Sequence, residues 1–217
     1  EASNEQDHLK GTQQRRGALG DRPYTVWGHG SFTSVDNTRN RTDDDSRYDG
    51  DIWGYNIGMD YRFQPKLVAG VSIGYLETDL TTTYNSGTYD ETSWTVSPYA
   101  MYHPMNGVTL SAIAGYSMGD VDITRSTTVT GNTDSDMWFA SLNGSHEHTP
   151  NPNIPLDLTT KLAVLVSRKT VDAFTENDNT VVAKSTSNTC QLKPGIEASY
   201  NFDAHGTTLH PFAKAVY

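Results

Sequence analysis

The chain has 217 residues, of which 35% are hydrophobic, with a formal net charge of -10 and one cysteine. This length allows one all-β barrel or two small domains. The acidic charge argues against nucleic acid as a partner, and the lone Cys190 excludes an internal disulfide. Because no run of about 18 apolar residues occurs, the sequence contains no membrane-spanning helix.

Segments in which apolar and polar residues alternate recur along the chain. The clearest is 53–63, where every odd position is aromatic or large and apolar and every even position is glycine or polar. Successive strand side chains point to opposite faces, so this segment has one apolar and one polar face. Pro98 cannot donate to a ladder, which predicts a bulge or local irregularity there. Nine strands are predicted, at 24–33, 53–63, 67–75, 94–102, 108–117, 138–142, 156–166, 192–202 and 209–217.

The connections between these strands alternate in length. After the odd-numbered strands come long segments rich in Thr, Asn, Asp and Ser, at 34–51, 77–92, 120–135 and 168–190. After the even-numbered strands come short turns rich in Pro, Gly, Asn and Asp, at 64–66, 104–107, 150–153 and 203–206. The alternation predicts that the two ends of the sheet face different environments, as in outer-membrane barrels with short periplasmic turns.

Aromatic residues on the apolar faces fall at two levels. Within a strand the levels are eight residues apart, as from Trp53 to Tyr61. At roughly 3.3 Å per residue this is about 26 Å along the strand, and tilt reduces it to about 20 Å, close to the apolar band of a membrane barrel. The predicted membrane girdle consists of Tyr24, Phe32, Trp53, Tyr61, Phe63, Tyr75, Trp94, Tyr102, Tyr116, Trp138, Tyr200 and Phe202.

The opposite faces carry charged residues that a packed soluble core could not bury. A hydrated lumen, or one filled by a polar helix, could hold them. The predicted lumen-facing polar residues are His29, Asp60, Arg62, Asp157, Lys161, Lys193, Glu197 and Lys214. We therefore predict an all-β fold, an antiparallel up-and-down transmembrane β-barrel, over residues 23–217, with a linker at 1–22.

Several motifs resemble the translocator β-domain of autotransporters (type V secretion). They are Arg-Pro-Tyr-Thr-Val-Trp-Gly-His-Gly at 22–30, the run from 48–54 into 58–63, and the strands at 67–75, 192–202 and 209–217. The resemblance implies twelve strands, with a helix that threads the lumen ahead of the first. About nine strands are present, so we expect that roughly three at the C-terminus are missing. Residues 1–22 are expected to be the linker, either as the tail of this helix or as a disordered polar terminus.

No motif indicates an enzyme, a metal site or a cofactor. The acidic run 43–51 fails the EF-hand spacing. The sequence His146-Glu147-His148 is too closely spaced for a zinc protease motif. His29 has no indicated catalytic partner, and the Asn-Asn junction of self-cleaving autotransporters is absent from 1–22. We therefore expect a protein without catalytic residues, metal or cofactor.

The expected function is an outer-membrane translocator that anchors and helps to export an N-terminal passenger. Its expected partners are outer-membrane lipid and its own passenger and linker. The resemblance also implies the barrel-assembly machinery and periplasmic chaperones as partners. Two alternatives stay open. One is a stand-alone porin-like or adhesin barrel in the outer membrane. The other is a soluble β-sandwich that binds carbohydrate through exposed aromatic residues and buries the apolar strand faces as its core.

Overall fold

Nine long strands form one antiparallel sheet in the computed structural model, which describes residues 23–38, 40–41, 44–45, 47–151, 154–200, 202–204, 207–209 and 212–216. Each strand pairs with its neighbours in the chain, so the topology is up-and-down. In order, the strands are β1 (Tyr24–Asn37), β4 (Tyr48–Gln64), β5 (Leu67–Thr82), β6 (Gly87–Tyr102), β7 (Val108–Arg125), β8 (Val129–His148), β9 (Leu156–Val171), β12 (Ser185–Tyr200) and β15 (Phe212–Val216). The predicted all-β, antiparallel up-and-down fold is confirmed.

Short elements lie in the connections. They are β2 (Asn40–Arg41), β3 (Asp44–Asp45), the 3-10 turn η1 (Thr83–Asn85), β10 (Phe174–Thr175), β11 (Val181–Val182), β13 (Phe202–Ala204) and β14 (Thr207–Leu209). We call the end of the sheet with the β1–β4, β5–β6, β7–β8 and β9–β12 connections the distal end, and the other the proximal end. Within the described residues no helix is long and apolar enough to cross a membrane.

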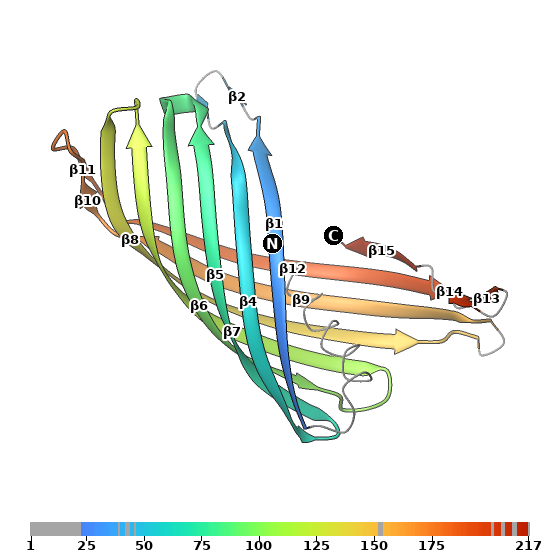
Figure 1. Ribbon diagram of the computed structural model, residues 1–217. Helices are drawn as coiled ribbons and strands as arrows, with labels where there is room; N and C mark the ends of the chain where they lie inside the picture. Colours follow the sequence, from blue (N-terminus) through green and yellow to red (C-terminus); the bar gives the residue numbers. More distant parts are fainter. Residues whose placement is uncertain are drawn as a thin grey trace.

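The sheet curls strongly, so that β9 and β12 run at a steep angle to β1 and β4 (Figure 1). Trp27 of β1 donates a hydrogen bond from Nε1 to the Tyr99 hydroxyl of β6 over 2.7 Å, although two strands lie between them. In a flat sheet these strands would be about 14 Å apart, because neighbouring strands are spaced by about 4.8 Å. The face that carries Trp27 and Tyr99 is therefore concave, and the other is convex. Among the described residues β1 and β15 do not pair, so the sheet is open.

Two of the long loops predicted at the distal end are mostly strand in the structure. Strands β5 and β6 continue to Thr82 and from Gly87, and β7 and β8 are joined by residues 126–128 alone. Most of 77–92 and 120–135 is therefore strand. Beyond the aromatic level the convex face becomes polar, while the concave face keeps apolar residues such as Leu80, Val121 and Ile123. The alternation with an apolar outer face therefore ends there, but neighbouring strands still satisfy each other's backbone groups.

The predicted alternation of connection lengths is thus wrong for these two segments. It is also wrong for the short turn predicted at 203–206, because β12 ends at Tyr200 and β15 begins only at Phe212. Each of the nine predicted strands nevertheless overlaps a strand of the sheet.

Two further boundaries differ from the prediction. The strand predicted at 192–202 starts earlier and ends at Tyr200, while Phe202 belongs to the β13–β14 hairpin. The strand predicted at 209–217 is divided between β14, which ends at Leu209, and β15. The linker predicted at 1–22 lies outside the described residues, as does Tyr217.

Pro98 interrupts one ladder without shifting it. Its pairing with Val71 of β5 is regular. On the β7 side, pairing stops after Val96 and resumes at Tyr99 in the same register, as expected where an N–H is missing. The predicted local irregularity is present, but the register shift characteristic of a bulge is found instead between Arg62 and Gln64, beside the β4–β5 turn.

Gly107 makes the β6–β7 turn possible. Its φ of 76° lies in the left-handed region, and a Cβ built there would lie 2.5 Å from the Glu147 carbonyl oxygen. We therefore expect Gly107→Ala to lower the free energy of unfolding by about 1–3 kcal/mol, measured by denaturant titration. Gly144→Ala is the control, because its Cβ would meet only Leu110 at 3.5 Å. Equal stability of the two variants would contradict the expectation.

Candidate functional site: the two faces of the sheet

Apolar residues gather on the convex face, where they are exposed. Ile57, Ile73 and Val96 are cross-strand neighbours with 60%, 47% and 51% of their surface accessible. The concave face instead buries small polar residues, among them Ser72, Ser97, Ser117 and Ser141. This distribution is the reverse of a soluble protein's, in which apolar side chains are the buried ones. The soluble β-sandwich alternative requires the convex apolar face to be covered, and in this structure it is not.

The residues of the predicted girdle lie on this convex face as cross-strand neighbours. Ring centroids are 4.5 Å apart for Phe32 and Trp53 and 5.0 Å apart for Tyr75 and Trp94. The described side chains are exposed, except that of Tyr75, which is half-buried. They are Tyr24, Phe32, Trp53, Tyr61, Phe63, Tyr75, Trp94, Tyr102, Tyr116, Trp138 and Tyr200; the side chain of Phe202 lies outside the described part. Their role as a membrane girdle stays a prediction.

The predicted lumen-facing residues occupy several separate places. Glu197 pairs in register with Lys214 of β15 and forms an ion pair of 2.5 Å with Lys161 of β9. Asp60 is buried, whereas Lys214 is exposed. Asp157 accepts a hydrogen bond of 2.6 Å from Thr149 near the proximal end. The half-buried members of the set are His29, Arg62, Asp157, Lys161, Lys193 and Glu197. The sheet thus brings Lys161 and Glu197 into contact and places Lys214 beside Glu197.

An aromatic cluster beside Asp60 was not predicted. The Tyr99 hydroxyl accepts a hydrogen bond from Trp27 and donates one to Asp60 Oδ2 over 3.4 Å. Both rings lie over glycines: a Cβ on Gly58 would be 2.4 Å from the Trp27 ring, and one on Gly70 would be 2.6 Å from that of Tyr99. Each glycine is the cross-strand partner of its aromatic residue. A glycine opposite an inward aromatic residue is the sequence signal that could have found this cluster, once the register was known.

A second network that was not predicted joins β6, β8 and β9 across the concave face at the distal end. The Glu91 carboxylate of β6 forms an ion pair with Lys169 of β9. It also accepts hydrogen bonds from Ser135 at 2.7 Å and from the Tyr89 hydroxyl at 2.9 Å. Lys169 also lies 5.8 Å from the centroid of the Tyr89 ring. Burial, followed by the charge and hydrogen bond of Glu91, raises the pKa of Tyr89. These groups lie beyond the girdle level of Trp94.

This network should make stability fall in acid. Burial acts to raise the pKa of Glu91, but the hydrogen bonds from Lys169, Ser135 and Tyr89 and the Lys169 charge outweigh it, so the pKa is lowered. A carboxyl with a depressed pKa contributes stability above its ordinary value of about 4.3, and the contribution is lost as pH falls through the folded pKa. We expect the stability difference between the parent and Glu91→Gln to be constant above about pH 5 and to shrink below it. A pH-independent difference in denaturant titrations would contradict this.

Four aspartates form a cross-strand row on the convex face just beyond the girdle. Asp51, Asp79, Asp90 and Asp122 are consecutive partners on β4, β5, β6 and β7. All four are exposed. The row includes one end of the acidic run 43–51, of which residues 43 and 46 lie outside the described part. Among described residues, no group of three or more His, Cys, Asp or Glu could hold a metal ion.

Like charges directly opposite one another weaken a sheet. Neutralising Asp90, which lies between Asp79 and Asp122, should therefore stabilise it. We expect Asp90→Asn to raise the free energy of unfolding by about 0.2–1 kcal/mol at low salt, and the gain to shrink at high ionic strength because salt screens exposed charges. Denaturant titrations at two salt concentrations provide the measurement. If the gain in stability does not depend on salt, it comes from packing and not from relief of charge repulsion.

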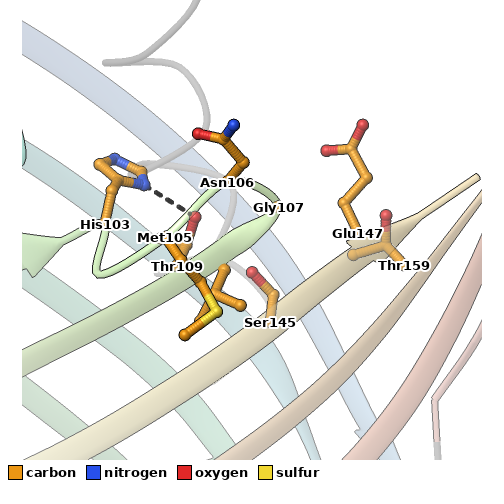
Figure 2. A pocket seen from close by; sticks show the side chains of 9 residues that line it. His103, Met105, Asn106, Gly107, Thr109, Ser145, Glu147 and Thr159 are labelled. Atoms are coloured by element: carbon orange, nitrogen blue, oxygen red, sulfur yellow. Dashed lines mark hydrogen bonds between the residues drawn. The ribbon is translucent and has the colours of Figure 1, made fainter.

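A shallow pocket lies at the β6–β7 turn, at the proximal end (Figure 2). His103 Nδ1 and Thr109 Oγ1 are hydrogen-bonded over 3.0 Å on one side, and Glu147 and Thr159 lie on the other. The rings of His146 and His148 stack with centroids 6.2 Å apart. Of the motif at 146–148, only Glu147 lines the pocket, so the pocket and the two histidines do not form one site.

Comparison with known proteins identifies the architecture. The model of the autotransporter β-domain family matches residues 26–217. The fold is similar to the translocator domain of the autotransporter NalP from Neisseria meningitidis, with a TM-score of 0.70, 14% identity, and coverage of 98% of this chain and 76% of that one. It is also similar to the β domain of the Bordetella autotransporter BrkA, with a TM-score of 0.71, 18% identity, and coverage of 89% and 77%. No curated protein sequence matches.

Proposed function

The chain belongs to the autotransporter β-domain family, and on this basis we propose that it acts as an outer-membrane translocator that anchors and helps to export an N-terminal passenger. The observation that carries the proposal is the reversed distribution of side chains. Ile57, Ile73 and Val96 are exposed on the convex face while polar residues are buried on the concave one. A membrane favours such an exposed apolar face, and a polar lumen accommodates the polar face.

In this function the residues divide by face. Convex aromatic residues such as Trp53 and Trp94 contact outer-membrane lipid and fix the depth of the sheet, since amphipathic rings favour membrane interfaces. Concave polar groups such as Lys161 and Glu197 contact the linker to the passenger. The proposal assigns no catalytic step, metal or cofactor. Folding into the membrane would involve periplasmic chaperones and the barrel-assembly machinery.

The test uses the full-length gene product in a Gram-negative host. We expect it in the outer-membrane fraction, with a gel mobility that changes between heated and unheated samples. Protease added to intact cells should digest its N-terminal part and leave the β-domain protected. Recovery as a soluble monomer without detergent would contradict the membrane assignment. Membrane insertion without any surface-exposed N-terminal part would contradict passenger export and favour a stand-alone barrel.

A further inference from the structure

The connection between β9 and β12 folds into a compact hairpin. Its strands β10 and β11 are antiparallel. The turn is closed by hydrogen bonds from the Glu176 amide to the Thr180 carbonyl and from the Asn179 amide to the Glu176 carbonyl, both 2.9 Å. Asn179 adopts a φ of 70°, which asparagine tolerates better than most residues. We call residues 172–184 the strap.

Arg125 at the end of β7 holds the strap. Its Nε donates to both carboxylate oxygens of Glu176 over 2.8 Å, and Nη2 forms an ion pair of 3.0 Å with Asp178. The Glu176 side chain is only 3% exposed. Such a multidentate guanidinium–carboxylate contact is among the stronger polar interactions in proteins and is fixed in geometry. The strap is therefore docked on β7 through one main side chain.

Asn177 adds a second attachment, to the β7–β8 turn. Its amide groups donate to the carbonyls of Thr130 and Thr128 over 2.9 and 3.0 Å, and its Oδ1 accepts from the Thr130 amide at 3.2 Å. The same turn contains Ser126 and Thr127 with φ of 51° and 61°, a conformation that is costly for a β-branched residue. The strap thus braces a turn in which two consecutive residues adopt this conformation. Figure 1 shows β10 and β11 at the distal end of the sheet, beyond β8.

The strap lies on the concave face. A Cβ on Gly131 would be 2.3 Å from the Phe174 ring, and the Thr133 hydroxyl donates to the Asp172 carbonyl over 3.0 Å. Strand residues two apart share a face. Gly131 and Thr133 therefore lie on the same face as Ser135, which donates a hydrogen bond to Glu91. The strap therefore rests on the concave surface of β7 and β8 at the distal end, on the same face as the Glu91–Lys169 ion pair.

We propose that the strap is a latched cover over the distal mouth of the concave channel, held shut mainly by Arg125 with Asn177 as a second attachment, and opened more often when the Arg125 contact is lost. The inference rests on the proposed function, because it takes the concave face as the channel through which the linker to the passenger runs. We take the distal end as the cell-surface end, as the sequence predicts. When shut, the strap limits access of solutes from the cell surface to the channel. Lifting the strap exposes the face that carries Thr133 to the outside.

The test measures access to Thr133, which is 7% exposed beneath the base of the strap. The full-length protein carries Thr133→Cys as its reporter, with Cys190→Ser to remove the exposed native thiol. Intact cells are treated with a membrane-impermeant maleimide. We expect Arg125→Ala to raise the labelling rate about tenfold or more, because losing a charge-assisted contact should raise the open fraction of the strap by about that factor. Glu176→Gln, which preserves the shape of the side chain, should raise it by less.

The matched control is Lys184→Ala. Lys184 forms an exposed ion pair of 2.9 Å with Asp172 within the strap itself, so its removal should leave the labelling rate unchanged. Heat-modifiable mobility is measured on the same cells. If the mobility shift is present and Arg125→Ala and Glu176→Gln label no faster than Lys184→Ala, the latch is overturned and the barrel stands. If the parent shows no shift, the membrane barrel fails, and the latched channel fails with it.

Discussion

Replacing Ile57 by arginine is expected to destabilise the membrane-inserted sheet by about 2–4 kcal/mol, the cost of a lipid-facing arginine near the centre of the bilayer. Ile57 is 60% exposed on the convex face, midway along β4 between the aromatic residues Trp53 and Tyr61. A lipid environment cannot hydrate the guanidinium, whereas water around a soluble sheet would. The measurement is a denaturant titration of the protein folded into phospholipid vesicles.

The neighbouring residue provides the matched control. Asn56 precedes Ile57 on β4 but points to the concave face, where it is half-buried opposite His29. An arginine there can reach the polar channel, so we expect Asn56→Arg to cost about 1 kcal/mol or less, as is usual for substitutions away from a packed core. If Asn56→Arg is the more damaging of the two, the concave face is the true core and the membrane assignment is wrong.

The sequence predicted the strands well only where one face of the sheet is apolar. The alternation around Ile57 and Ile73 identified strands and faces, because period two is a direct consequence of strand geometry. Beyond Trp94 the same strand continues through Thr92 and Asp90, but its own two faces are mainly polar there. No periodicity marks such a segment, and only pairing with β5 and β7 makes it a strand.

The contacts that join distant strands could not be predicted from alternation alone. The hydrogen bond between Trp27 and Tyr99 requires the register of three successive strand pairs and the curl of the sheet. Arg125 and Glu176 meet because a connection folds back onto another hairpin, and a chain rich in Thr and Asn gives no sign of that. By contrast, Lys161 and Glu197 were predicted to share a face, and the sheet brings them into contact.

The second large effect is expected at Gly58, where a valine side chain would displace the Trp27 ring. The ring lies 2.4 Å from the position of a Cβ on Gly58, and it is held in place by its bond to Tyr99. Moving it breaks that bond and exposes the Asp60 cluster. We expect Gly58→Val to lower the free energy of unfolding by about 1–3 kcal/mol, the usual cost of overpacking, in the same vesicle titration. Gly28→Val is the control, since its nearest neighbour would be the Asn56 carbonyl at 3.7 Å.

A double substitution separates overpacking from a loss of strand flexibility at Gly58. If the cost comes from the Trp27 ring, removing the ring should relieve it. The double variant Trp27→Ala, Gly58→Val should then lose less free energy of unfolding than the two single variants lose in sum. The expected difference is about 0.5–3 kcal/mol, the range of coupling between residues in contact. Simple additivity would show that the two residues do not act on each other. The glycine would then matter for its backbone, and the close packing of Trp27 on β4 would be a consequence of the curl rather than one of its causes.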